Sequence, residues 1–215
     1  MSFAASPGFF NESVNDFEAG YRGQITKAFS ADLSLFYDQY SNIRSADFVS
    51  TLFAPYPAPH LVTLGVTNNG IEAVGKGAES SIAWQVLSGW KLEGSYTYNI
   101  FNPWLGSSDP PGTEYGSLRL PSHNKWRLQS YINISKAWKF DTFIYFTSSG
   151  DPLNNLGPNI PVPSYARLDV RLGYQQGPHW RLSLAGQNLL EARHLEAVAE
   201  SYVNRSVYLK STWQF

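Results

Sequence analysis

The stretch WKLEGSYTYNI, residues 90–100, alternates between two kinds of side chain over its whole length. One set reads Trp, Leu, Gly, Tyr, Tyr, Ile, and the other reads Lys, Glu, Ser, Thr, Asn. Because successive side chains of a β-strand point to opposite faces, this period of two predicts a strand with one apolar and one polar face. The strand is longer than the roughly 5–6 residues usual in globular proteins. It matches the roughly 9–11 residues of a tilted strand that crosses a membrane.

Eight further segments show this alternation, so we expect nine strands. They cover residues 16–26, 31–40, 71–86, 125–134, 138–146, 166–175, 180–187 and 206–215. The connections alternate in length. Residues 27–30, 87–89, 135–137 and 176–179 form short turns, whereas residues 44–70, 101–122, 147–164 and 188–204 form long connections rich in Pro, Gly, Asn and Ser. Outer-membrane barrels show the same alternation of connection lengths, with short periplasmic turns and long extracellular loops.

The sequence therefore predicts an all-β fold, a segment of an antiparallel up-and-down transmembrane β-barrel, in a single domain over residues 1–215. The helix-prone stretch 189–200 falls inside a long connection, where we expect a loop with at most one helical turn. An odd number of strands argues against a self-contained bacterial barrel, because such barrels have an even number.

The composition supports a membrane-facing β protein. Charged residues make up only 15% of the chain and aromatic residues another 15%. The longest stretch without Asp, Glu, Lys or Arg, residues 48–71, contains three prolines and cannot form a transmembrane helix. The formal net charge of -1 gives no electrostatic case for binding nucleic acid. The first residues lack the pattern of a signal peptide, so we expect the chain to be the back part of a longer protein or a cytosolic protein of unusual composition.

Tryptophans gather near the short turns, as at a membrane–water interface. Trp90, Trp138 and Trp180 follow short turns, and Trp84 and Trp213 end strands on the same side. The alternative is that these residues are core anchors of a soluble sheet.

Five motifs together resemble one family, the TonB-dependent outer-membrane receptors. The C-terminal motifs are YARLDVRLGY (165–174), WRLSLAGQNLL (180–190) and RSVYLKSTWQF (205–215), which resemble the last three barrel strands of that family. The other two are TNNGIEAVGKGAE (67–79) and the pair NESV (11–14) and FEAGY (17–21). The resemblance implies a C-terminal barrel portion, since barrels of this family have about 22 strands and a plugged lumen. The plug domain and the segment that contacts TonB would be absent.

The polar strand faces supply the first set of candidate site residues. In the receptor interpretation they face the lumen, where they contact the plug and line a hydrated interior. They are Glu18, Arg22, Asp38, Glu79, Lys91, Glu93, Arg127, Asp169 and Arg171. Three aromatic residues in predicted loops, Tyr56, Trp104 and Tyr115, are candidates for contact with a ligand. Ordinary loop packing is the alternative for each of them.

The C-terminus resembles the signal read by the barrel assembly machinery. Phe215 is the last residue, and Leu209 and Trp213 precede it on the same face of the predicted strand. Strand addition to the machinery would pair main-chain groups while alternate side chains fill pockets.

The sequence predicts no catalytic residues, no cofactor and no metal site. Zero cysteines exclude thiolate chemistry, and the four histidines, His60, His123, His179 and His194, have no partner histidine at ligand spacing. No nucleophile-elbow or phosphate-loop motif occurs.

We therefore expect a segment of an outer-membrane transport receptor, not an enzyme, that serves as scaffold and conduit for TonB-dependent uptake of a scarce nutrient such as a ferric siderophore. Its expected partners are outer-membrane lipid, the barrel assembly machinery, and the missing plug and strands, with the TonB system acting through them. Two alternatives stay open: a small freestanding outer-membrane channel or adhesin barrel, and a soluble β-sandwich that binds glycans.

Overall fold

The computed structural model describes residues 2–5, 8–106, 113–114, 120–150, 161–197 and 201–215. Its strands are β1 (Ser2–Ala5), β2 (Ser13–Thr26), β3 (Phe29–Ala54), β4 (His60–Leu87), β5 (Trp90–Leu105), β6 (Thr113–Glu114), β7 (Asn124–Asn133), β8 (Trp138–Thr147), β9 (Tyr165–Gln176), β10 (Trp180–Gln187), β11 (Arg193–Ala197), β12 (Ser201–Asn204) and β13 (Ser206–Trp213).

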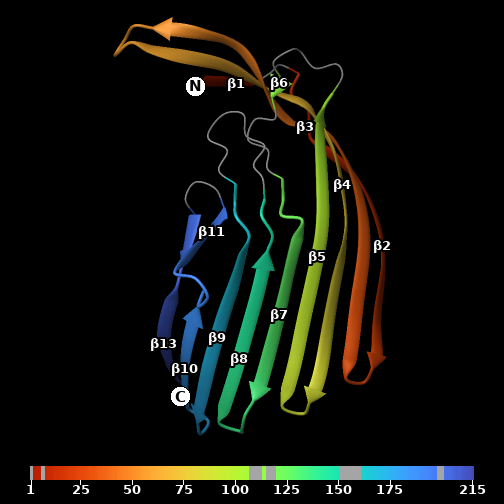
Figure 1. Cartoon of the computed structure of the whole chain (residues 1–215), viewed down its shortest axis with the longest axis vertical. Coiled ribbons are helices and arrows are strands. Elements are labelled where there is room, and N and C mark those ends of the chain that lie inside the picture. Colours follow the sequence, from red (N-terminus) through yellow and green to blue (C-terminus); the bar gives the residue numbers. More distant parts are fainter. Residues whose placement is uncertain (1, 6–7, 107–112, 115–119, 151–160, 198–200) are drawn as a thin grey trace.

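Nine of these strands form one antiparallel meander in the order β2-β3-β4-β5-β7-β8-β9-β10-β13. They are the nine strands that the alternation predicts, and the all-β fold is confirmed. Figure 1 shows them side by side, with the four short turns at the lower end and the longer connections at the upper end. In the turn between β9 and β10, Gly177 has a φ of 61°, a conformation that glycine adopts without steric cost.

The prediction of a loop over residues 44–70 is wrong. Strand β3 continues to Ala54 and β4 begins at His60, so the two form a long hairpin arm that extends beyond the rest of the sheet (Figure 1). The prolines that suggested a loop all lie in the connection 55–59 at its tip. The register shifts between Tyr40 and Ser50, where the arm leaves the sheet, and β1 and β6 pair with its base.

The predicted helical turn in residues 189–200 is also wrong for residues 189–197, the part of this stretch that the structure describes. Strands β11 and β12 form a small hairpin there, in which Arg193 pairs with Asn204 and His194 with Val203. Backbone pairing therefore overrides the helical propensity of this stretch. The predicted boundary at residue 101 is misplaced too, because β5 continues to Leu105 through its pairing with β4.

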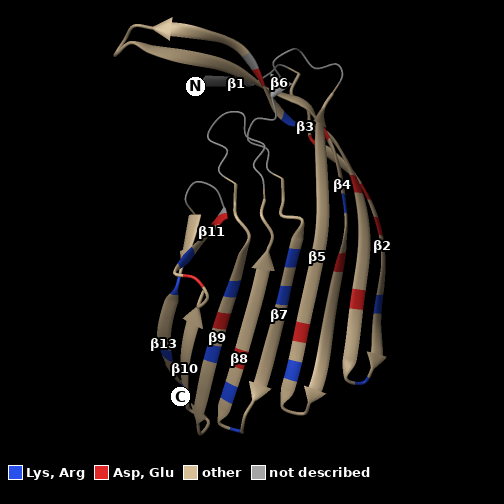
Figure 2. Ribbon diagram, in the orientation of Figure 1, with Lys and Arg blue, Asp and Glu red and all other residues tan. Residues whose placement is uncertain are grey.

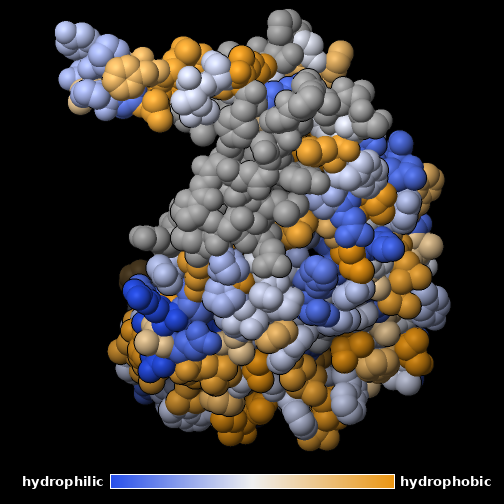
Figure 3. All heavy atoms as spheres, turned by 45° about the horizontal axis from the view of Figure 1, so that its top comes forward, coloured by the Kyte–Doolittle hydropathy of each residue, from blue (hydrophilic) through white to orange (hydrophobic). Residues whose placement is uncertain are grey.

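Burial in the sheet is the reverse of that in a soluble domain. In the described part of the chain, a small apolar cluster of Ile43, Ile71 and Ala73 lies where the arm begins, packed against Tyr40, Phe101 and Leu105. Large apolar side chains are instead exposed along the strands, and Figure 3 shows hydrophobic residues crowding the lower part of the molecule. Monomeric soluble proteins rarely expose apolar surface on this scale.

The described residues contain no helix of the length and apolarity that a membrane crossing requires.

The two edge strands of the meander, β2 and β13, run in the same direction. Both lead toward the end that carries the short turns, because nine antiparallel strands put the first and the last in the same orientation. The sheet is open in this structure. A direct β2–β13 seam would have to be parallel, so closure with antiparallel seams requires an odd number of additional strands.

Candidate functional site

The register divides the side chains of the meander between two faces. The outer face is the one that carries Tyr96, Trp126 and Phe146, which are successive cross-strand partners on β5, β7 and β8. The inner face carries Ser95 and Arg127, opposite each other in the same strand pair. Rows of partners extend across the sheet on each face, so one alternating pattern per strand produces two continuous surfaces.

All nine candidate lumen residues lie on the inner face by register. Figure 2 shows the charges of both signs along the middle of the strands. Four of the basic residues contact carboxylates. Arg22 pairs with Asp32, Lys91 with Glu93 at 2.6 Å, Arg167 with Asp169, and Arg171 with Asp141.

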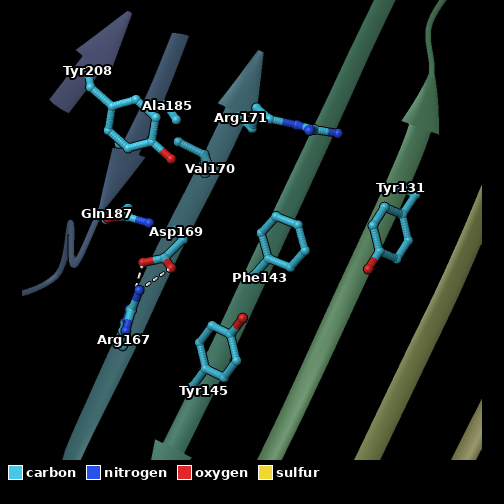
Figure 4. A pocket seen from close by; sticks show the side chains of 11 residues that line it. Tyr131, Phe143, Tyr145, Arg167, Asp169, Val170, Arg171, Ala185, Gln187 and Tyr208 are labelled. Atoms are coloured by element: carbon cyan, nitrogen blue, oxygen red, sulfur yellow. Dashed lines mark hydrogen bonds and ion pairs between the residues drawn. The ribbon is translucent and has the colours of Figure 1, made fainter. Parts of the chain in front are cut away.

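A cavity of about 430 Å³ opens on this face over β7, β8, β9, β10 and β13 (Figure 4). Its aromatic side is formed by Tyr131 and Phe143, whose rings meet edge to face at 5.7 Å. Its charged side is formed by Arg167, which donates hydrogen bonds from Nε to Oδ1 of Asp169 at 2.9 Å and from Nη2 to Oδ2 at 2.7 Å. The guanidinium of Arg167 also lies 5.6 Å from the centre of the Tyr145 ring.

A second cavity of about 390 Å³ adjoins the first and shares Tyr145 and Arg167 with it. Lys125 and Arg127 add two further cations, and Glu196 supplies a carboxylate. A third, of about 570 Å³, lies over β2, β3, β4, β5 and β7. It includes Arg22, Asp32 and Glu93, and it shares Arg127 with the second. The inner face is thus hollowed and lined by both aromatic and charged groups.

A buried polar network connects this face to the β11–β12 hairpin. Asn188, fully buried, has a φ of 53°, a left-handed conformation that Asn tolerates better than most residues. Its backbone N–H donates to Oδ1 of Asp169 at 2.9 Å, and its side-chain Nδ2 donates to the carbonyl of Val203 at 3.0 Å. Its Oδ1 therefore accepts from Nδ1 of His194 at 3.1 Å.

His194 links this network to the charges of β9. Its Nε2 lies 2.8 Å from Oε1 of Glu196, and its ring stacks on Tyr165 at 4.2 Å. Glu196 in turn lies 3.7 Å from Arg167. Sequence reasoning missed this network because its members come from three segments. The sequence signals were the polar pair Gln187–Asn188 directly after an alternating strand and the pair His194 and Glu196, two residues apart.

The C-terminal residues are highly exposed. Leu209 lies opposite Leu184, and Trp213 lies opposite Trp180, both on the outer face. Trp213 is 60% exposed, and Phe215 follows the end of β13 and is fully exposed. Strand β13 has no neighbour on its other side in the described part of the chain.

The three candidate loop aromatics do not form a group among the described residues. Tyr56 lies at the tip of the arm and is 84% exposed. Trp104 is in the upper end of β5 rather than in a loop, opposite Glu72, and shares the outer face with Tyr96. Tyr115 lies outside the described residues.

Within the described residues, no group of three or more His, Cys, Asp or Glu side chains is arranged to hold a metal ion. The inner face offers charged and aromatic contacts, and the outer face offers an apolar surface.

Comparison with protein families finds a match to the TonB dependent receptor-like β-barrel over residues 4–189. No curated protein matches the sequence.

Solved structures share the fold at low sequence identity. The FrpB iron transporter from Neisseria meningitidis is 11% identical with a TM-score of 0.73, and the match covers 99% of this chain and 32% of that one. The siderophore receptor PirA from Acinetobacter baumannii is 16% identical with a TM-score of 0.69, covering 95% and 32%. The copper transporter OprC is 12% identical with a TM-score of 0.68, covering 97% and 32%. The chain thus spans about a third of the length of these structures.

Proposed function

The chain belongs to the TonB-dependent receptor-like β-barrel family, a family of outer-membrane transport receptors, and on that premise we propose that it forms part of the wall of a nutrient importer. The cargo would be a scarce, bulky nutrient such as a ferric siderophore. The observation that carries the proposal is the pairing of two opposite surfaces on one sheet. An aromatic outer face suits lipid, and a hollowed, charged inner face suits a hydrated lumen.

Strand direction supports a wall that is completed by other strands. Two copies of this chain, joined edge to edge in the same orientation, would have two parallel seams, since β2 and β13 run the same way. A plugged barrel of about 22 strands would add 13 strands, an odd number, to these nine. The remaining strands, the plug and the TonB contact would then come from a preceding part of the receptor.

The proposed cargo rests on the similarity of this chain to other transporters, because the fold alone does not determine which nutrient is carried. The similar structures include iron, siderophore and copper transporters, and each likeness extends to the fold alone. A bulky chelate is favoured because a barrel of this class has a lumen wide enough for a plug and a translocated ligand.

The test is uptake by cells that carry the complete receptor. We expect accumulation of an iron-loaded siderophore that stops when TonB is absent or when the gene is deleted, and that returns on complementation. Screening a panel of ferric siderophores, haem and copper chelates covers the cargo classes. Uptake of none of these, with the receptor present in the outer membrane, would contradict the importer.

The freestanding channel and the soluble glycan-binding module are separated by two simple measurements. A freestanding channel would admit small solutes without TonB. A soluble module would remain in the aqueous fraction without detergent, because its aromatic residues would be buried.

A further inference from the structure

His194 on β11 is 5% exposed, and both of its ring nitrogens lie close to oxygen atoms. Nδ1 lies 3.1 Å from Oδ1 of Asn188, and Nε2 lies 2.8 Å from Oε1 of Glu196. A neutral imidazole has one nitrogen that donates a hydrogen bond and one that can only accept. The charge of His194 therefore depends on whether either oxygen atom carries a proton that it can donate.

The amide oxygen of Asn188 cannot donate, and its orientation is fixed by a second contact. Nδ2 of Asn188 donates to the carbonyl oxygen of Val203 at 3.0 Å, and a carbonyl oxygen can only accept. Turning the amide over would place its oxygen against that carbonyl, so that two acceptors would face each other. Nδ1 of His194 therefore carries a proton and donates it to Asn188.

Glu196 lies beside a guanidinium group, which stabilises the ionised form of its carboxyl. Its Oε1 is 3.7 Å from Nη1 of Arg167. An ionised carboxylate only accepts hydrogen bonds, and it accepts strongly from charged donors. Nε2 of His194 therefore carries the second proton, and the ring is a positively charged imidazolium when the β11–β12 hairpin is docked on β9.

The direct surroundings of His194 suit a positive charge. Its ring stacks on Tyr165 with the ring centres 4.2 Å apart, and the face of an aromatic ring attracts cations. The charged groups of this network are Arg167, Asp169 and Glu196, joined by ion pairs of 2.7 Å and 3.7 Å. Two carboxylates are thus balanced by two cations only when His194 is charged.

Other titratable groups lie near this network and have no ion pair with it in the described part of the chain. They are Arg193 and Arg205 beside the hairpin, Lys125 and Arg127 on β7, and Tyr145 on β8. The first two have contacts of their own, with the ring of Tyr202 and with the backbone carbonyl of Glu191. The four basic residues oppose a further cation, so the direct contacts of His194 are what favour its charged form.

We propose that a positively charged His194 holds the β11–β12 hairpin on β9, and that the hairpin is released when the ring loses a proton at alkaline pH. We call Asn188, His194 and Glu196 the latch. A neutral His194 must place a lone pair against the oxygen of either Asn188 or Glu196, and so loses one of its two contacts. The docked state contains a proton that the neutral ring lacks, so a rise in pH favours release. The latch consists of residues of this chain alone and does not depend on the cargo.

Release would open one end of the inner face. The hairpin lies at the end of the sheet that carries the longer connections, beyond the end of β10 (Figure 1). Through Glu196 it forms one side of the second cavity, whose other lining residues come from β5, β7, β8 and β9. Detaching the hairpin removes that side, so the pH of the medium would control access to this cavity.

Hydrogen exchange in the complete receptor, followed by mass spectrometry, measures release. Protection of residues 193–204 is the exchange rate of a free peptide of the same sequence divided by the rate in the receptor, which removes the intrinsic effect of pH. Between about pH 6 and pH 9, a range that spans ordinary histidine titration, wild-type protection should fall about tenfold, the effect of losing one hydrogen bond to a charged group. Residues 165–176 of β9 are the internal reference and should keep their protection.

Glu196→Gln is the decisive variant. Its amide can donate to Nε2 of a neutral His194 while Nδ1 still donates to Asn188, so the hairpin should stay protected at both pH values. His194→Phe keeps an aromatic ring against Tyr165 but removes both hydrogen bonds. It should lower protection at both pH values and abolish the pH response. The matched control is His179→Phe, which removes a histidine that contacts the carbonyl of Gln214 and should leave the response of the hairpin unchanged.

Wild-type protection that is the same at the two pH values would overturn the latch. Loss of protection in Glu196→Gln at either pH would also overturn it, because a neutral histidine and a donating amide should satisfy every contact. A pH response that persists in His194→Phe would assign the response to another group. Uptake is measured separately, so a receptor that transports nothing but keeps the pH response contradicts the proposed function and leaves the latch standing.

Discussion

Tyr96 on β5 and Trp126 on β7 lie opposite each other on the outer face, and each side chain is about two-fifths exposed, at 41% and 40%. The residue before Tyr96, Ser95, lies opposite Arg127 on the inner face. Adjacent residues of one strand thus meet different environments. If the outer face contacts lipid, a charge should destabilise the protein at position 96 and have little effect at position 95.

The first prediction replaces each of these two residues with arginine in the complete receptor. An arginine on the lipid face near the membrane midplane costs roughly 2–4 kcal/mol, whereas a lumen position tolerates it. We therefore expect Tyr96→Arg to lower the free energy of unfolding, and so the stability, by about that amount and Ser95→Arg to change it little. Equilibrium unfolding in urea in lipid vesicles measures both. Equal effects at the two positions would contradict the assignment of the faces.

The second prediction concerns Phe215. Its side chain is fully exposed beyond the last paired residue, Trp213, so it contributes little packing to the finished sheet. Phe215→Ala should therefore reduce the amount of receptor inserted into the outer membrane while leaving the melting temperature of the inserted protein unchanged. Resistance to unfolding in cold detergent reports the folded fraction. Gln214→Ala is the control, and equal insertion of all three forms would remove the assembly role.

The third prediction tests the network around Asn188. Asn188→Ala removes two side-chain hydrogen bonds. It also places alanine at a φ of 53°, a left-handed conformation that alanine tolerates less well than asparagine. Leaving a buried partner unsatisfied costs about 1–3 kcal/mol, so we expect the β11–β12 hairpin to detach. Proteolysis within residues 193–204 should accelerate. Asn188→Gly keeps the backbone conformation but loses the same hydrogen bonds, and should fall between wild type and alanine. Unchanged cleavage of the alanine variant would show that the network does not hold the hairpin.

The fourth prediction concerns the arm. Among the described strands, residues 51–63 of the arm pair only with each other. Strand β1 pairs with β4 from Leu64 onward, and β5 pairs with β4 from Ile71 onward. Replacing residues 51–63 with an Asn-Gly turn would join the paired residues Ser50 and Leu64 directly. Membrane insertion and thermal midpoint should match wild type. Loss of folded receptor would show that the arm is part of the barrel's structural framework.

The period of two predicted the nine strands and the residues on each face, because a strand exposes that period directly in its sequence. It did not predict the arm, since the prolines at its tip masked the alternation of the residues beside them. It also did not predict the contacts of His194. Its stacking on Tyr165 depends on where the chain returns in space, because Tyr165 lies at the start of β9 and His194 in β11. The cavities could not be predicted either, because their shape depends on side chains from several strands at once.

The central claim is that one face of this sheet meets lipid and the other meets water. The direct measurement is the pair Tyr96→Cys and Ser95→Cys in the complete receptor, each labelled with a fluorophore and reconstituted in liposomes that contain a lipid-borne quencher. The account predicts strong quenching at position 96 and little at position 95. Quenching at 95 and not at 96, or at neither position, would contradict it.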